Sequence, residues 1–134
     1  MNSSESNRFT FTAFNLASKL AKTYIEYGEI VTKFSIALGV GPREPMSRVA
    51  TIAKFMEDNG FHAMWVQDNP LTTKDAYIAL TVAALSTERL VLAPGVTNTV
   101  IRHPSVIVNS VSSLDNLVPG RTILGIGGGG PSLM

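Results

Sequence analysis

The sequence predicts an α/β protein in which strands and helices alternate along a parallel sheet. Short apolar runs alternate with longer segments in which apolar residues recur at helical spacing. The connections between successive elements are too short for anything but right-handed crossovers between parallel neighbours. Four strand–helix units are expected over residues 33–134, and the chain stops directly after a glycine run that should lead into another helix. We therefore expect the amino-terminal portion of a larger α/β domain.

The predicted strands are short apolar runs that end in turn-forming residues. They cover residues 33–40 (KFSIALGV), 61–66 (FHAMWV), 90–93 (LVLA) and 122–127 (TILGIG). After the third run, Pro94 and Gly95 should bulge or break the strand, because proline cannot donate to a sheet ladder and glycine tolerates unusual backbone geometry. Ligands favour the carboxyl ends of strands in parallel α/β folds, so a site is expected there.

Helices are predicted before and between these strands. Residues 13–31 carry an apolar stripe at helical spacing, which predicts an amphipathic helix in an extension at residues 1–32, followed by the strand–helix domain at residues 33–134. The later helices should run from Pro45 to Met56, from Ala76 to Leu85 and from Pro104 through Leu114. Thr73 or Asp75 can cap the second of these, and proline suits the first turn of the third.

The composition indicates a globular domain and excludes several classes of function. The chain has 134 residues, 45% of them hydrophobic, and a formal net charge of +1. Its basic and acidic residues are scattered, so there is no electrostatic footprint for nucleic acid or anionic lipid. The absence of cysteine excludes disulfides and thiolate chemistry. No apolar run approaches the roughly 20 residues that cross a bilayer, and we expect a cytoplasmic protein without nucleic acid or membrane partners.

The candidate site residues follow the second and third strands. Asp68 comes just past the second strand, with Asn69 beside it, and Thr97 and Asn98 follow the interruption of the third. On position alone, Asp68 suits helix capping or loop bracing as well as chemistry. These small polar side chains should meet at one edge of the sheet, because the carboxyl ends of parallel strands lie together.

Other motifs carry less specific signals. Gly125, Gly127 and Gly130 satisfy the G-x-G-x-x-G spacing, but a dinucleotide fingerprint normally follows the first strand and precedes an acidic residue by about 20 positions. A glycine-rich loop that lets a planar ligand or phosphate approach, or a plain flexible turn, fits this place better. His103 should hydrogen-bond the start of the helix at Pro104 rather than transfer protons. No histidines are paired at ligand spacing and no G-x-S-x-G elbow occurs, so we expect no metal site and no hydrolase.

Read together, three stretches resemble the luciferase-like family of flavin- and deazaflavin-dependent oxidoreductases, which includes methylenetetrahydromethanopterin reductases. They are GFHAMWVQD, AALSTERLVLAPGVTNTVIRHP and LDNLVPGRTILGIGGG. The resemblance runs from about Lys33 to the end of the chain. It implies the amino-terminal half of a TIM (β/α)8 barrel, with four parallel β/α units preceded by the amino-terminal helix, and a cofactor ring at the carboxyl ends of the strands.

The resemblance also implies which residues contact the cofactor. Deazaflavin-using members have a non-prolyl cis peptide after the third strand, and the matching bond is Gly95–Val96. The residues expected to bind the cofactor are Asp68, Gly95, Val96, Thr97, Asn98, Gly127 and Gly128. Asp68 and Asn69 are the expected catalytic positions. Many deazaflavin members have histidine where this chain has Asn69, and an amide does not exchange protons near neutral pH as an imidazole does.

The expected function is an oxidoreductase that moves hydride between the deazaflavin coenzyme F-420 and a small-molecule substrate. An FMN-dependent monooxygenase is the alternative within the family. A half-barrel exposes two sheet edges and half a core, so an inactive fragment or a non-catalytic subunit is the alternative from another class. The expected protein partner is then a second copy of the chain or a complementing carboxyl-terminal half.

Overall fold

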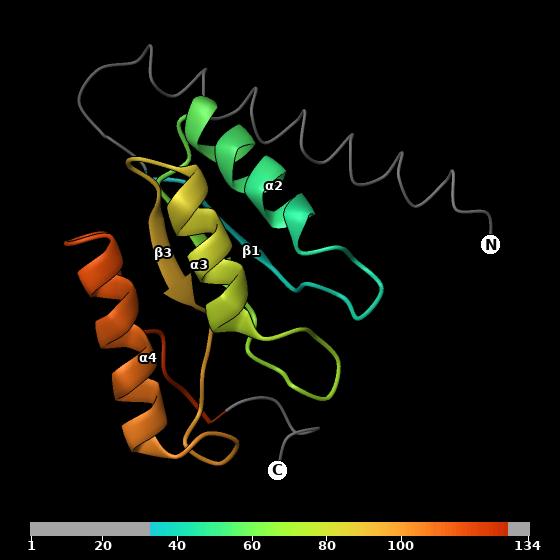
Figure 1. Ribbon diagram of the computed structural model, residues 1–134, viewed down its shortest axis with the longest axis vertical. Coiled ribbons are helices and arrows are strands. Elements are labelled where there is room, and N and C mark those ends of the chain that lie inside the picture. Colours follow the sequence, from blue (N-terminus) through green and yellow to red (C-terminus); the bar gives the residue numbers. More distant parts are fainter. Residues whose placement is uncertain (1–32, 129–134) are drawn as a thin grey trace. The chain divides into compact units, whose positions relative to one another are not determined.

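The computed structural model describes residues 33–128, in which strands and helices alternate (Figure 1). The elements are β1 (Ser35–Leu38), α2 (Ser47–Asp58), β2 (Ala63–Val66), α3 (Ala76–Ser86), β3 (Val91–Pro94) and α4 (Pro104–Leu117). The first three predicted strands and the last three predicted helices are therefore confirmed. The helix predicted at residues 13–31 and Gly130 lie outside the described residues.

The three strands form a parallel sheet in the order β1-β2-β3. Leu38, Val66 and Pro94 stand opposite one another at the carboxyl ends of the strands. Figure 1 shows α2 and α3 side by side in front of the sheet and α4 on the other side of α3, consistent with the contacts that α3 makes with both neighbours. The predicted α/β class with parallel neighbouring strands is confirmed.

The core lies between the sheet and the helices. Met56 from α2, Leu80 from α3, and Met64 and Leu92 from the strands are fully buried. Helix α3 also buries four alanines, whose small side chains let it pack close to the strands. Burying one large apolar side chain contributes roughly 1.5–3 kcal/mol, so this layer is the main source of stability within the described residues.

The prediction of a fourth strand at residues 122–127 (TILGIG) is corrected by the structure. Within residues 33–128, this segment makes two isolated parallel bridges, Leu92 to Thr122 and Thr97 to Ile126, instead of a continuous ladder. Between the bridges Pro94 has no N–H to donate, and the offset between paired residues changes by one, as at a β-bulge. The expectation of four strands was wrong here because the partner strand cannot complete the ladder.

Helix α4 is attached by few side chains. Ile107 and Leu114 are its buried residues, whereas Val106, Val108 and Leu117 are exposed. The packing of α4 therefore depends mainly on these two buried side chains.

The start of α4 is defined by local contacts. Pro104 occupies the first turn, and Nδ1 of His103 accepts a hydrogen bond from the backbone N–H of Ser105 at 3.3 Å. A proline suits this place because its missing N–H would have no partner there. The hydrogen-bonding role predicted for His103 at the start of this helix is confirmed.

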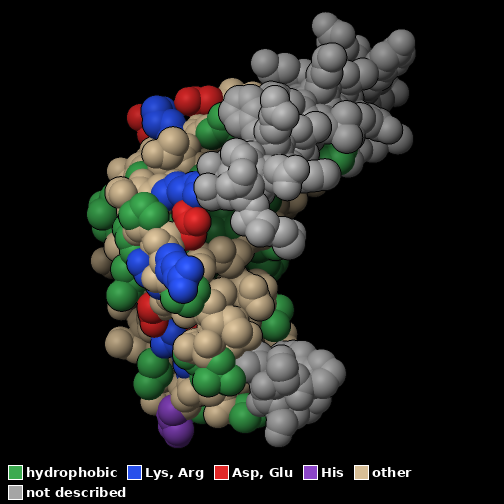
Figure 2. Space-filling model, turned by 90° about the vertical axis from the view of Figure 1, so that its right-hand side faces the viewer, with side chains coloured by type: hydrophobic (Ala, Val, Ile, Leu, Met, Phe, Trp, Pro, Cys, Tyr) green, Lys and Arg blue, Asp and Glu red, His purple; other side chains and the backbone are tan. Residues whose placement is uncertain are grey.

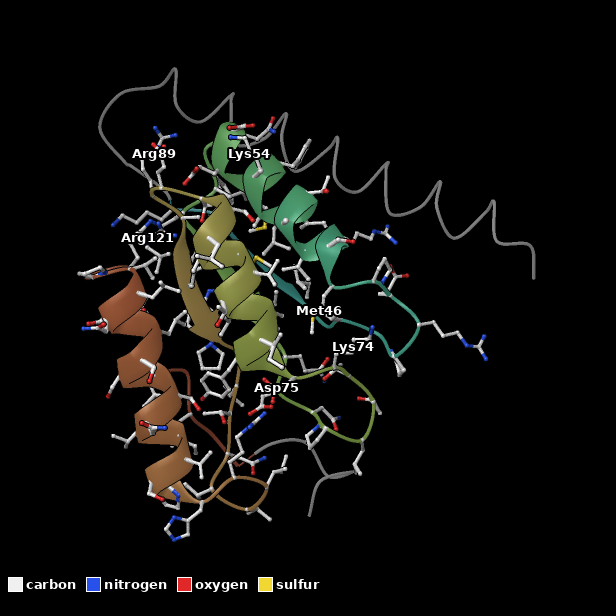
Figure 3. The ribbon with its side chains drawn as sticks, in the orientation of Figure 1. Met46, Lys54, Lys74, Asp75, Arg89 and Arg121 are labelled. Atoms are coloured by element: carbon white, nitrogen blue, oxygen red, sulfur yellow. The ribbon has the colours of Figure 1, made fainter. Side chains whose placement is uncertain are left out.

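Two side chains hold the connection between α3 and β3 at the amino-terminal end of the sheet. The Glu57 carboxylate accepts hydrogen bonds from three successive backbone N–H groups, those of residues 88–90. Arg121 donates to the carbonyl oxygens of Thr87 and Leu90. Figure 3 shows Arg121 at the opposite end of the sheet from Asp75. This end of the sheet is thus held by side chains bound to backbone.

The surface in view is of mixed charge. Figure 2 shows basic and acidic side chains interspersed on that face, with no wide area of one sign among the side chains visible there. Within residues 33–128, no helix is both long enough and apolar enough to cross a membrane.

Candidate functional site

An open pocket of about 370 Å³ lies at the carboxyl ends of the three strands. Its lining residues are Ala37, Leu38, Gly39, Gln67, Asp68, Asn69, Gly95, Val96, Gly127 and Gly128. Six of the eight residues that sequence reasoning placed at a site are therefore brought together here. The other two, Thr97 and Asn98, are buried and do not line the pocket. The fold thus places the loops after β1, β2 and β3 and the glycines at residues 127–128 around one space.

Val96 forms an apolar part of the pocket lining. Its side chain is 40% exposed, and the Gly95–Val96 peptide bond is cis, as the resemblance implied. The neighbouring backbone packs on Trp65: a Cβ built on Gly95 would lie 3.0 Å from Cβ of Trp65, and one built on Gly125 would lie 2.9 Å from its Cζ3. Trp65 is the only tryptophan of the chain, so its fluorescence reports on this part of the pocket.

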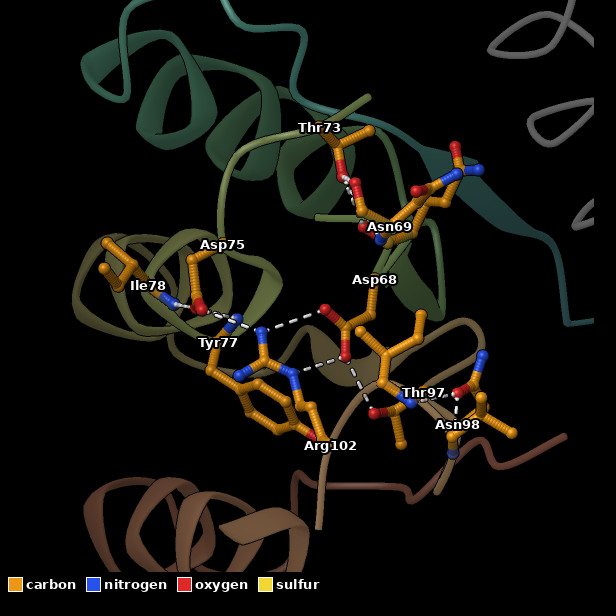
Figure 4. A network of polar contacts seen from close by, with 12 residues as sticks. Asp68, Asn69, Thr73, Asp75, Tyr77, Ile78, Thr97, Asn98 and Arg102 are labelled. Atoms are coloured by element: carbon orange, nitrogen blue, oxygen red, sulfur yellow. Dashed lines mark hydrogen bonds and ion pairs between the residues drawn. The ribbon is translucent and has the colours of Figure 1, made fainter. Parts of the chain in front are cut away.

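Asp68 is the centre of a buried polar network next to the pocket (Figure 4). Arg102 donates to both carboxylate oxygens, from Nε to Oδ2 at 2.7 Å and from Nη2 to Oδ1 at 3.0 Å. Oγ1 of Thr97 donates to Oδ2 at 2.7 Å. The Asp68 side chain is only 2% exposed. These contacts correspond to the loop-bracing role that the position of Asp68 suggested.

Asn69 and Asn98 brace the loops in which they lie. Oδ1 of Asn69 accepts a hydrogen bond from the backbone N–H of Leu71 at 3.2 Å. Oδ1 of Asn98 accepts from the N–H groups of Val100 and Ile101 at 3.0 and 2.9 Å. Turns of this kind are a common use of asparagine. They fix the backbone just after β2 and β3, where the pocket begins.

The hydrogen bonds of this network shift the pKa values of Arg102 and Asp75. The hydrogen bond to Asp68, with a further one to Asp75, holds the pKa of Arg102 above its ordinary range although burial alone would lower it. Burial would raise the pKa of Asp75, but hydrogen bonds from Arg102 and from the backbone of Ile78 and Tyr77 lower it on balance. Arg102 and Asp75 are therefore both charged at neutral pH.

Tyr77 lies under the guanidinium of Arg102. The Arg102 Cζ atom lies 5.1 Å from the centre of the Tyr77 ring, within the range of a cation–π contact. Burial raises the pKa of Tyr77. Its hydroxyl oxygen has no hydrogen-bond partner among the described residues. The tyrosine therefore supports Arg102 through its ring.

Sequence reasoning missed Arg102, Tyr77 and Gln67. It did place Asp75, which caps α3 by accepting from the backbone N–H groups of Tyr77 and Ile78 at 2.9 and 3.0 Å. Arg102 was within reach of the same logic, because an acid after one strand and an arginine after the next meet at the same edge of a parallel sheet. Within residues 33–128, no three His, Asp or Glu side chains are grouped as a metal site needs.

Comparison with known proteins identifies the family. The model of the luciferase-like monooxygenase family matches residues 28–134. The chain belongs to this family. The resemblance noted in the sequence is confirmed, and the three parallel strands correspond to part of a luciferase-like TIM barrel.

The relatives are longer proteins. Over 88 residues the chain is 38% identical to the 5,10-methylenetetrahydromethanopterin reductase of Methanolobus tindarius, an alignment that covers 66% of this chain and 27% of the relative. It is 29% identical over 98 residues to the 4-hydroxyprotoasukamycin monooxygenase of Streptomyces nodosus subsp. asukaensis, covering 69% of this chain and 26% of that one. The solved coenzyme F420-dependent tetrahydromethanopterin reductase of Methanopyrus kandleri is similar with a TM-score of 0.69 at 34% identity, over 75% of this chain and 28% of that structure. The chain thus spans about a quarter of the length of these relatives.

Proposed function

We propose that residues 33–128 form the ring-binding part of an oxidoreductase that moves hydride between the deazaflavin coenzyme F-420 and a small-molecule substrate. The observation that carries the proposal is the pocket at the carboxyl ends of the strands, with Val96 and four glycines in its lining. The similarity to the solved coenzyme F420-dependent tetrahydromethanopterin reductase supports a deazaflavin as the occupant.

The residues present fit a planar ring. Val96 and Leu38 offer apolar surface, while Gln67 and Asn69 bring amide groups to the same pocket. A Cβ built on Gly128 would meet no atom within 4 Å, so the backbone here leaves open space. A bound deazaflavin supplies the hydride chemistry, and the protein supplies orientation and exclusion of water.

Each residue of this chain then has a limited part. Val96 gives the ring an apolar surface and keeps water from it, and the loop glycines let the ring approach the backbone. Asp68 holds the loops in place through Arg102 and Thr97. Asn69 provides hydrogen bonds but no proton transfer, because an amide does not titrate near neutral pH.

Ligand titration of the purified chain tests the proposal. Deazaflavin and FMN are each added while Trp65 fluorescence is followed, and absorbance shows whether a chromophore was purified with the protein. We expect the deazaflavin to bind more tightly than FMN. Tighter binding of FMN would favour the monooxygenase alternative, for which the relative from Streptomyces nodosus is the supporting observation. Binding of neither ligand would contradict both.

A pair of matched variants locates the site. Val96 and Val100 lie in the same loop, but Val96 lines the pocket while Val100 is 71% exposed and does not. Val96→Asp places a charge against the ring and should weaken binding by about tenfold or more. Val100→Asp should leave binding unchanged. Equal effects of the two substitutions would place the ligand elsewhere.

A second candidate is a chain that holds a cofactor only when completed by another part. Within the described residues β1 pairs with β2 alone, and Ile123, Leu124 and Ile126 are 40%, 42% and 54% exposed. Such surfaces normally pack against further strands. The completing part would be a second copy or a complementing carboxyl-terminal half. Binding that appears only when the remaining barrel segment of a relative is added in trans would support this candidate.

A further inference from the structure

Arg102 joins two connections of the fold, β2–α3 and β3–α4, through one side chain. It lies after β3, binds both oxygens of Asp68 after β2, and donates from Nη2 to Oδ2 of Asp75 at the start of α3 at 2.7 Å. Its own side chain is 19% exposed, and that of Asp68 is 2% exposed. Figure 4 shows the guanidinium between the two carboxylates, with the Tyr77 ring against it.

We infer that Arg102 is a positioning residue for the cofactor pocket, which holds the loop at residues 96–98 against the loop at residues 67–69. The ligand part of this inference rests on the proposed function. The positioning itself rests on the contacts of the chain alone.

A continuous series of hydrogen bonds connects Arg102 to the pocket lining. Asp68, held by Arg102, accepts from Oγ1 of Thr97 at 2.7 Å. The backbone N–H of Thr97 donates to the carbonyl of Gly125 at 2.9 Å, and its carbonyl accepts from the N–H of Gly127 at 3.0 Å. Val96, next to Thr97, and Gly127 are both pocket residues. A shift of the Asp68 carboxylate is thus passed to Val96 and Gly127 in the pocket lining.

The geometry requires a guanidinium rather than any cation. Three hydrogen bonds leave one planar group toward two carboxylates, and its face rests on an aromatic ring. A lysine ammonium has neither the planar fork nor the stacking face. Without Arg102, the buried Asp68 carboxylate would also lose its neutralising partner, so the two loops would have to rearrange or take in water.

Arg121 offers a matched control at the other end of the sheet. It too is partly buried and donates three hydrogen bonds, two to Thr87 and one to Leu90. Arg102→Gln and Arg121→Gln therefore remove similar numbers of contacts. They differ in that Arg121 lies at the opposite end of the sheet from Asp75, a partner of Arg102 (Figure 3).

The experiment compares ligand affinity with stability in these variants. Deazaflavin affinity is measured by quenching of Trp65, and stability by urea unfolding. We expect Arg102→Gln to weaken binding by about tenfold or more, and Arg121→Gln to change it by less than about twofold even where it costs as much stability. Arg102→Lys should restore part of the stability but little of the affinity. Equal affinity losses in both glutamine variants, or no loss in Arg102→Gln, would overturn the inference.

Two provisions keep the test decisive. If Arg102→Gln does not fold, Asp75→Asn removes one acceptor of Arg102 while asparagine still caps α3, and it should weaken binding by about threefold or more. If the wild-type chain binds neither deazaflavin nor FMN, the proposed function fails, but Trp65 emission still tests the positioning. Its maximum should then shift in Arg102→Gln and stay in place in Arg121→Gln; no shift in either would overturn the inference.

Discussion

The two ends of the sheet are held by different kinds of polar contact. At the amino-terminal end, Glu57 and Arg121 bind backbone groups of residues 87–90. At the carboxyl end, Arg102 binds the side chains of Asp68 and Asp75. The first arrangement secures the chain path, and the second secures side chains that stand next to a pocket.

This difference shows how stability and site geometry can be assigned to separate residues. Backbone N–H groups need partners wherever they are buried, so a carboxylate that receives several of them stabilises whatever the protein binds. An ion pair between two loops contributes less to stability, because the desolvation of two buried charges offsets most of the free energy of their attraction. Its effect is to select one relative position of the loops.

The largest expected effect is at the amino-terminal end. Glu57→Ala leaves three backbone N–H groups, those of residues 88–90, without their acceptor and should lower the free energy of unfolding by about 3 kcal/mol. Urea unfolding measures this. Asp58→Ala, which removes an exposed carboxylate from the same helix, should change it by less than about 0.5 kcal/mol. Ligand affinity of folded Glu57→Ala should equal that of the wild type. A loss of affinity would show that the two ends of the sheet are energetically coupled, which would contradict the comparison.

A smaller loss is expected where the carboxyl end packs most tightly. A Cβ on Gly125 would lie 2.2 Å from the carbonyl oxygen of Pro94, so Gly125→Ala should cost about 2 kcal/mol and shift the emission of Trp65. At Gly41 the nearest atom would be 3.8 Å away, and Gly41→Ala should cost little. Emission spectra and urea unfolding of both variants check this. An unchanged spectrum in Gly125→Ala would contradict the packing of Trp65 on this loop.

The third substitution separates affinity from stability. Asp68→Asn keeps the shape of the side chain but removes the charge that receives Arg102 and Thr97. We expect a stability loss of about 1–2 kcal/mol and a larger effect on deazaflavin binding, about tenfold or more. Asp115→Asn, at an exposed acid that accepts from the N–H of Gly120, is the control. If Asp68→Asn lowered stability but left affinity intact, the network at the carboxyl end would stabilise the fold without positioning the pocket.

The smallest effect concerns pH. Burial alone would raise the pKa of Glu57, but hydrogen bonds from residues 88–90 and the charge of Arg89 lower it below its ordinary value of 4.5. A carboxylate with a lowered folded-state pKa stabilises the fold above its unfolded-state pKa, and this contribution is lost as the pH falls through the ordinary and then the folded value. Stability should therefore fall from about pH 6 to about pH 3, and less steeply in Glu57→Gln. Parallel curves for the two proteins would contradict this.

The sequence was informative where the determinants are local. Alternating apolar runs and helical spacing located three strands and three helices, and the rule that ligands meet the carboxyl ends of strands located the pocket near Asp68. Val96 was placed at this pocket by the family resemblance alone. Asp75 and His103 were found because a cap is recognised within a few residues of the helix that it begins. Each of these inferences needed only neighbouring residues.

The rest depended on residues far apart in the chain. Arg102 reaches an acid 34 positions earlier, and Glu57 binds backbone 31 to 33 positions later. The fourth strand failed for the same reason. TILGIG reads as a strand by itself, but whether it completes a ladder is decided by the missing N–H of Pro94 on its neighbour.

Because few side chains of α4 are buried, this helix should open locally more often than α3 does. The free energy of local opening is roughly the free energy of the burial that is lost. Opening α4 exposes two buried apolar side chains, Ile107 and Leu114, whereas opening α3 exposes six buried residues. Amide hydrogens of α4 should then exchange with solvent through partial opening, while those of α3 should exchange only on global unfolding. Since Arg102 lies just before α4, the cohesion of the pocket does not depend on the last helix staying closed.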